Sequence, residues 1–229
     1  RTLLTLLLPL ALAPVIAAMP QDLMTGDVVA GVANGEYDVF DNGGNFLLTL
    51  NDGMGGSTTG AFYDTGINLL YTTNFSSSTI VVYDGMDPHS IVMTIPTGPF
   101  GGAQVESIVF DNSGDFYVGH ASGDLDIKKF SSAGALLDTF NVQTEDRGSD
   151  WIELATDQST MFYTSEGRRI LRYDVAADTQ LADFTVLPGV VDFAFALRLL
   201  PPFDGSGGLI VADTSNVKRL DGAGAVAQT

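Results

Sequence analysis

The sequence predicts an all-β protein, a β-propeller of four-stranded antiparallel blades. Two observations carry this prediction. Past residue 25, short runs of β-branched and aromatic residues are separated by clusters of Gly, Asp, Asn and Ser, a pattern typical of strands joined by tight turns. The same unit then recurs about every 45 residues, a period characteristic of propeller blades.

Four stretches align as one repeating unit, starting at Gly60, Ser107, Glu153 and Leu197. Each has an apolar run, an Asp-containing turn, a second run, a third run that closes on an aromatic residue or Leu, and then a fourth. The turn aspartates are spaced by 47, 46 and 47 residues and are Asp64, Asp111, Asp157 and Asp204. A single sheet cannot bury both of its faces, so neighbouring units must pack face to face around an axis. A β-sandwich fold would not explain why similar units recur along the chain. One coil of a β-helix would be shorter than this repeat.

We count five units, and both ends are imperfect. The first, GDVVAGVANGEYDVFDNGGNFLLTL from Gly26, lacks an obvious innermost strand, and the last stops at Thr229 within its fourth strand. The units form either a five-bladed ring or an incomplete six- or seven-bladed one, or another segment completes the sheet. The stretch Val15–Met19 is one candidate for such a strand. An open edge also invites pairing with another chain, including filament formation.

The recurrent pattern FD-x-x-G-x-x-Y-V resembles that of NHL-repeat propellers. The stretches SDWIELATDQSTMFYTSEGRRILRYDV and FALRLLP…GGLIVADTSNVKRLD are similar to a group of exported bacterial propellers of uncharacterised function. The resemblance covers about residues 26–229. It implies a propeller with six or seven blades and says little about activity, because the shared residues belong to strands and turns.

The first 20 residues have the pattern of a secretory signal peptide. Arg1 precedes an apolar run that contains Pro9 and Pro14, and small residues follow at Ala17 and Ala18. The alternative is a retained apolar segment; a stable membrane span is not expected. We therefore divide the chain into residues 1–20 and a propeller domain, 21–229. The expected location is extracellular or at the cell surface, and the periplasm is also compatible.

The composition excludes several classes of function. The chain has 28 acidic and 10 basic residues, a formal charge of −18, which argues against a nucleic-acid partner because phosphates require a basic surface. It has no cysteine, so a disulfide, a thiolate zinc site and a cysteine nucleophile are all excluded.

Acidic residues cluster at the expected starts of three successive inner strands, where a propeller channel opens. They are Glu106, Asp150, Glu153 and Asp192. Converging carboxylates at such a mouth can hold calcium, as in gluconolactonase-like propellers, whose metal activates a lactone. Those enzymes also use an Asn ligand, and no inner strand here offers one. The simpler interpretation is an acidic, hydrated channel mouth. With Trp151, the residues Glu106, Asp150 and Asp192 mark the expected binding face for a protein or glycan partner.

The sequence offers no catalytic set. Asp111-x-x-Gly114-Asp115 resembles the start of a calcium loop but lacks the twelfth-position Glu, so we interpret it as a hairpin turn. Of two histidines, His89 is expected in solvent, and no nucleophile motif accompanies either. The pair Lys128-Lys129 is expected on a solvated face. The predicted function is an exported, non-catalytic propeller that acts in binding, scaffolding or surface assembly. The alternative is a divalent-metal-dependent hydrolase or lactonase with the axial acidic site.

Overall fold

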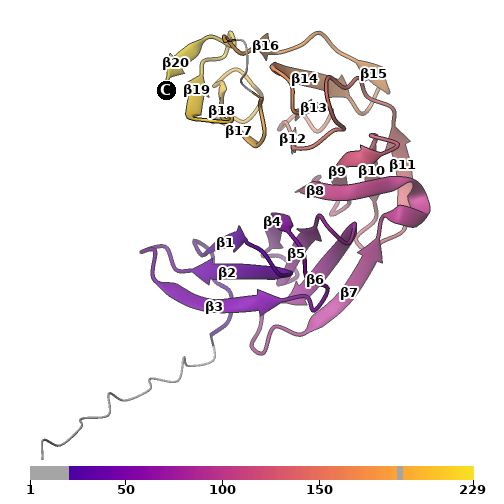
Figure 1. The fold of residues 1–229 in the computed structure, drawn as a ribbon, viewed down its shortest axis with the longest axis vertical. Coiled ribbons are helices and arrows are strands. Elements are labelled where there is room, and N and C mark those ends of the chain that lie inside the picture. The colour runs from indigo at the N-terminus through magenta and orange to yellow at the C-terminus, as the bar shows by residue number, and fades with distance from the viewer. Residues whose placement is uncertain (1–20, 190–192) are drawn as a thin grey trace, which may run out of the picture.

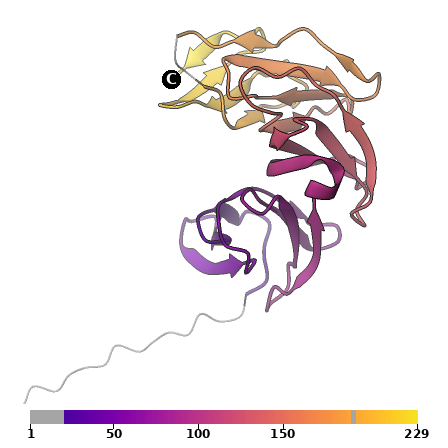
Figure 2. The same cartoon turned by 45° about the vertical axis from the view of Figure 1, so that its right-hand side comes forward.

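Five antiparallel sheets follow one another along a curved arc (Figure 1). The computed structural model describes residues 21–189 and 193–229. Within those residues the chain forms strands and turns, with one short 3-10 helix, η1 (Gly98–Phe100). Figure 2 shows the same order of sheets from a second direction, with the first and last sheets apart at the two ends of the arc. The all-β propeller prediction is confirmed.

Each sheet is one blade, and the chain completes one blade before starting the next. Blade 1 contains β1 (Val28–Gly31), β2 (Glu36–Phe40) and β3 (Phe46–Asn51). Blade 2 contains β4 (Thr58–Asp64), β5 (Leu69–Asn74), β6 (Thr79–Asp84) and β7 (Ile91–Pro96). Blade 3 contains β8 (Gly102–Phe110), β9 (Phe116–Gly123), β10 (Ile127–Phe130) and β11 (Leu136–Phe140).

The last two blades have shorter outer strands. Blade 4 contains β12 (Ile152–Leu154), β13 (Thr160–Tyr163), β14 (Arg169–Asp174), β15 (Thr179–Gln180) and β16 (Thr185–Val186). Both β15 and β16 pair with β14, so the outer strand of this blade is split in two. Blade 5 contains β17 (Leu197–Leu199), β18 (Leu209–Ala212), β19 (Val217–Leu220) and β20 (Val226–Gln228).

Blade 1 is incomplete on its inner side. Its sheet has three strands in the order β1-β2-β3, against four or more in each other blade. The repeat places β2 at the third position of a blade and β3 at the fourth, so the innermost strand is the one that is absent among the described residues. The expectation from the sequence is therefore confirmed, and β1 is an edge strand.

The repeated aspartates make turns, as the sequence predicts. Asp111 Oδ1 accepts hydrogen bonds from the backbone N–H of Ser113 at 2.8 Å and of Asp115 at 3.1 Å. Gly114 has a φ of 85°, a left-handed conformation that residues with a Cβ adopt at a cost. Asp64 and Asp204 accept in the same way from the residue two positions later. The carboxylates thus stabilise β-hairpins.

The hydrophobic core consists of four clusters, one at each junction between neighbouring blades. At the junction of blades 2 and 3, Phe62 stacks on Phe110 with ring centroids 4.4 Å apart, and Phe116 stacks on Phe130 at 5.6 Å. Burying an aromatic side chain of this size contributes about 1.5–3 kcal/mol. Packing between blades therefore contributes to the stability of the fold at each junction.

A hydroxyl-to-carbonyl hydrogen bond also links each of three successive junctions near the axis. In each case a Ser or Thr donates to a backbone C=O on, or just before, the innermost strand of the following blade. The bonds run from Thr73 to Glu106 at 3.0 Å, from Ser107 to Asp150 at 2.6 Å and from Thr164 to Phe195 at 2.5 Å. The backbones approach so closely here that a Cβ on Gly119 would lie 2.1 Å from the carbonyl oxygen of Ser149. These contacts fix the position of each inner strand relative to the previous blade.

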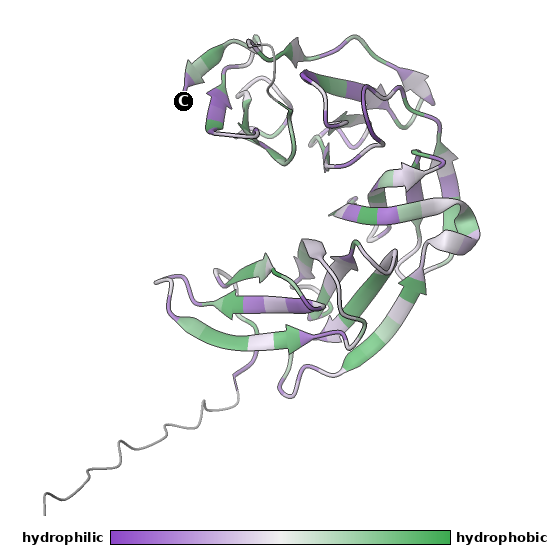
Figure 3. Ribbon diagram, viewed as in Figure 1, coloured by the Kyte–Doolittle hydropathy of each residue, from purple (hydrophilic) through white to green (hydrophobic). Residues whose placement is uncertain are grey.

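The two end blades differ from the inner ones in how their strands are buried. In β5 and β9 nearly every side chain is buried, because a blade lies on each side. In β2 and β19, buried positions alternate with more exposed ones, which is the pattern of a sheet covered on one face. In Figure 3, which is coloured by hydropathy, β2 is purple toward its start and green toward its end, so hydrophilic and hydrophobic residues both lie on this strand. Each end of the arc therefore presents one uncovered sheet face.

We predict that Ser107→Ala destabilises the protein by about 1–3 kcal/mol, because it leaves a buried acceptor and a buried donor without partners. Ser107 is 1% exposed, and its Oγ also accepts from the N–H of Ile152 at 3.1 Å. Urea denaturation measures the change. Ser132→Ala, an exposed position in a turn, is the control and should shift stability by no more than about 0.5 kcal/mol. Equal effects of the two substitutions would contradict the role of the junction hydrogen bond.

Candidate functional site

Glu106 and Asp150 occupy equivalent positions in blades 3 and 4. Glu106 lies on β8, and Asp150 lies two residues before β12. Their backbone carbonyls accept the junction hydrogen bonds from Thr73 and Ser107, and β8 packs against β12. The two residues therefore lie on adjacent blades, where the charge of Glu106 acts on the carboxyl group of Asp150.

Both carboxyl groups are buried without hydrogen-bond partners at most of their oxygens. Asp150 is 1% exposed, and neither of its carboxyl oxygens has a partner among the described residues. The same is true of Oε2 of Glu106. A buried carboxylate without a donor or a cation is costly, so such a group tends to hold its proton.

Burial is the main cause of a large pKa shift at both residues. It raises the pKa of Glu106 to about 7, and the charge of Glu166 adds to the rise. Burial also raises the pKa of Asp150 to about 8, with further contributions from the charges of Glu106 and Glu166. Arg147 opposes both shifts. The guanidinium of Arg147 is engaged elsewhere, with Glu166 at 3.2 Å and Gln104 at 2.5 Å.

Glu153 has a different environment. Its Oε2 accepts from the guanidinium of Arg198 in blade 5 at 2.7 Å. Arg198 also lies over the ring of Trp151, 6.0 Å from the centroid. Trp151 is half-buried against the core of blades 4 and 5. Glu153 and Trp151 therefore belong to the side of blade 4 that meets blade 5.

The four candidate metal ligands are therefore only partly brought together. Glu106 and Asp150 interact electrostatically, whereas Glu153 is paired with Arg198. Asp192 lies outside the described residues. Within residues 21–189 and 193–229, no three His, Asp or Glu side chains are arranged to hold a metal ion.

A hollow of about 270 Å³ lies on the uncovered face of blade 5. Its lining is mostly apolar and consists of Trp151, Ala196, Leu197, Arg198, Ile210, Ala212 and Val217. We call it the blade 5 hollow. Val217 is 62% exposed and Ile210 is 37% exposed, although both lie in strands where an inner blade buries such residues. A second, adjacent depression extends this face toward Arg219 and Gln228.

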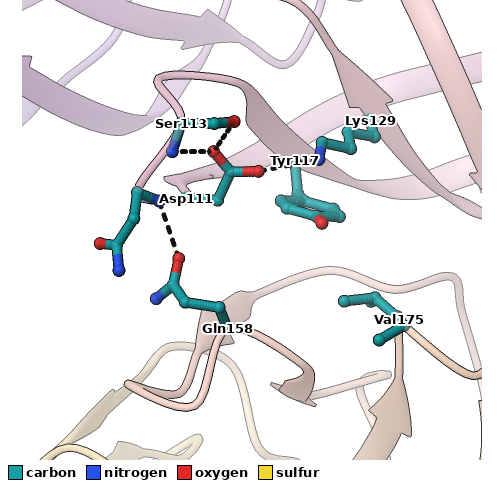
Figure 4. Close-up of a pocket in the computed structure, with 8 residues that line it drawn as sticks. Asp111, Ser113, Tyr117, Lys129, Gln158 and Val175 are labelled. Carbon is teal, nitrogen blue, oxygen red and sulfur yellow. Dashed lines mark hydrogen bonds and ion pairs between the residues drawn. The ribbon is translucent and has the colours of Figure 1, made fainter.

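A more polar hollow of about 360 Å³ lies between the turns of blades 3 and 4 (Figure 4). Asp111, Ser113 and Lys129 lie on its blade 3 side, facing Gln158 and Val175 of blade 4. The ammonium of Lys129 is 2.8 Å from Asp111 and lies over the Tyr117 ring. The polar side chains that line this hollow therefore interact mainly with one another.

Two expectations about single side chains are wrong. His89 is 7% exposed, because Nδ1 lies 3.1 Å from the carbonyl oxygen of Asp84 and Nε2 lies 3.0 Å from that of Gln21. The side chain of Lys128 is fully buried and pairs with Asp124 at 2.5 Å. Local sequence could not show that other segments would cover these two residues.

The sequence analysis also missed Arg147, which lies near Glu106 and Asp150. It did not single out four residues at the uncovered end, Arg198, Ile210, Val217 and Arg219. The signal was present for the last three, because LIVA and VKRL place them on one side of their strands. It can be interpreted only when one knows that no described blade follows.

Comparison with known proteins supports the fold. The WD40 β-propeller domain of Doa1 superimposes with a TM-score of 0.66 at 16% sequence identity. The match covers 86% of this chain and 60% of that one. The chain folds as a β-propeller with five blades. The chain spans 60% of the length of the propeller that it matches. At 16% sequence identity, the similarity shows the fold alone.

The comparisons leave the finer family assignment open. No protein-family model and no curated protein sequence matches the chain. The resemblance to NHL repeats and to exported bacterial propellers therefore stays a prediction. Among the described residues, no helix has the length and hydropathy needed to cross a bilayer.

We predict that the Glu106–Asp150 pair makes stability fall as pH rises. The folded pKa values, about 7 and about 8, exceed the ordinary values of 4.5 and 3.8. The folded state therefore keeps protons that the unfolded chain releases, and stability declines from about pH 4 to about pH 8. Urea denaturation across this range should show a shallower decline for Glu106→Gln/Asp150→Asn. The exposed control Asp87→Asn/Asp138→Asn should follow the wild type, and a parallel decline in the site variant would contradict the shifts.

Proposed function

We propose that the protein is an exported, non-catalytic propeller that binds another protein through the uncovered face of blade 5. The observation that carries the proposal is the blade 5 hollow. It combines a half-buried tryptophan, exposed aliphatic side chains and an arginine, the residue types that are enriched where proteins bind one another.

The position of the hollow supports this function. An inner blade covers each such face with the next blade, whereas blade 5 leaves its face uncovered among the described residues. An exposed apolar patch on a soluble protein generally marks an interaction surface. The similarity to a WD40 propeller is compatible with a binding or scaffolding role. The export of the protein rests on the signal-like residues 1–20 alone.

We predict that a charge placed in the hollow abolishes partner binding. Val217→Asp should lower retention of the partner about tenfold or more, since an unpaired carboxylate would be buried at the interface. The immobilised protein is exposed to the extracellular proteins of its source, and retained proteins are quantified. Val92→Asp changes a similarly exposed strand residue on blade 2 and should retain the wild-type level.

Trp151 supplies a second readout of the same binding. It is the only tryptophan in the chain and it lines the hollow, so its emission reports on this surface alone. A retained partner should shift the emission to shorter wavelength as water leaves the indole ring. Retention that is equal in the wild type and Val217→Asp, or that leaves Trp151 emission unchanged, would show that the hollow is not the binding surface.

The second candidate function is a divalent-metal-dependent hydrolase or lactonase. The observation that favours it is the set of three buried carboxyl oxygens without partners on Glu106 and Asp150. Two carboxylates can contribute to a calcium site if backbone oxygens and water complete it. Saturating calcium should then raise the melting temperature of the wild type and not of Asp150→Asn. An unchanged melting temperature in the wild type would remove this candidate.

A further inference from the structure

The positive charges of this protein are confined, apart from Arg1, to the second half of the chain. After Arg1 the first Lys or Arg in the sequence is Lys128, whereas Asp and Glu occur throughout blades 1 and 2. Among the described residues, no salt bridge reaches these two blades from blades 3 to 5. Blades 1 and 2 therefore carry uncompensated negative charge, which favours a cationic partner.

A hollow of about 300 Å³ lies beside this acidic region, between the first turns of blades 2 and 3. Phe62 and Asp64 line it from β4, and Phe110, Asn112 and Gly114 line it from β8 and the turn that follows. We call it the blade 2–3 hollow. The same turn separates it from the hollow of Figure 4, which lies on the blade 4 side. Both walls of the blade 2–3 hollow belong to blades that have a described neighbour on each side.

Two stacked aromatic rings form the apolar wall of the blade 2–3 hollow. The ring centroids of Phe62 and Phe110 are 4.4 Å apart, and Tyr71 meets Phe110 edge-on at 4.8 Å. Phe62 and Phe110 are only half-buried, whereas Phe116 in the same cluster is fully buried. The face of an aromatic ring attracts a cation that lies within about 6 Å of its centroid. The wall is therefore suited to a cationic group on an apolar stem.

Asp64 supplies a carboxylate to the same hollow. Its Oδ1 accepts the N–H of Gly66 at 2.8 Å, and no described donor or cation binds its Oδ2. Asp111, the turn aspartate of blade 3, instead uses its second oxygen to bind Lys129 at 2.8 Å. Burial and then the charge of Asp64 raise the pKa of Tyr71, so this charge acts on the aromatic cluster. Asp64 thus has one carboxylate oxygen available to a ligand.

We propose that the blade 2–3 hollow binds an arginine side chain of a partner protein. The guanidinium donates to Asp64 and lies beside the Phe62–Phe110 pair, because rings 4.4 Å apart leave no space between them. The side-chain oxygen of Asn112, which has no described donor, accepts a further N–H. Arginine fits this combination better than lysine, since its planar, weakly hydrated guanidinium both stacks on rings and donates to carboxylates.

This site goes beyond the proposed function, because it shares no lining residue with the blade 5 hollow. The negative field of blades 1 and 2 attracts a basic segment toward it, and the attraction weakens as salt rises. The two sites can fail separately. Val217→Asp should bind an arginine probe like the wild type, whatever its effect on partner binding at blade 5.

NMR titration of the isotope-labelled full chain with N-acetyl-arginine methylamide tests the site. The amide signals of Gly66, Asn112 and Gly114 should shift, and the shifts should saturate. N-acetyl-citrulline methylamide has nearly the same shape without the charge, and it should leave these signals in place. Shifts that do not saturate, or equal binding of the citrulline probe, would overturn the proposal.

Substitutions in the hollow give the second readout. Asp64→Asn and Phe62→Leu should each weaken binding of the arginine probe about threefold or more, since each removes one of the two attractions. Phe62→Tyr keeps the ring and should bind like the wild type, which separates loss of the ring from disturbed packing. Asp138→Asn removes an exposed charge outside the hollow and is the matched control. An equal effect of Asp64→Asn and Asp138→Asn would show only general attraction to an acidic protein and would overturn the site.

Discussion

The structure depends on one constraint, that each inner blade has two apolar faces and must be covered on both. β5 and β9 bury nearly all of their side chains only because a blade lies on either side. The hydroxyl-to-carbonyl bonds at the junctions then fix how far each inner strand is displaced along its neighbour. Positions near the axis, including those of Glu106 and Asp150, follow from this geometry. Blades 1 and 5 each have one face that no described blade covers.

The fold could be predicted from the sequence because turn residues mark the repeat of about 45 residues. An aspartate that accepts hydrogen bonds from its own turn, as Asp111 does, marks each hairpin independently of what packs around it. The missing inner strand of blade 1 was visible for the same reason. The split outer strand of blade 4 was not, because the expected strand LADFTV (residues 181–186) overlaps only β16, whereas β15 lies just before it.

The candidate site was predicted less completely. The sequence predicted that Glu106 and Asp150 lie at or near the starts of successive inner strands, and in the structure the backbone carbonyls of both accept junction hydrogen bonds. It could not show that Arg198 would reach across from blade 5 to Glu153, since that contact joins residues 45 positions apart. Nor could it show that Lys128 is buried, because one adjacent lysine side chain points into the blade and the other away from it. Side-chain partners between blades depend on rotamers, and the repeat pattern does not encode them.

The order of the described blades also bears on how they lose their structure. In a closed propeller every blade has two neighbours, so no blade can unfold without breaking two junctions. Here blade 1 and blade 5 each have one described junction, and blade 1 in addition has an edge strand along the axis. The contacts between blades join neighbours along the chain, so the described blades form a linear array in which blades 1 and 5 have one described neighbour each. Among the described blades we therefore expect local opening to begin in blades 1 and 5, and the amide protons of blade 3 to exchange most slowly with solvent.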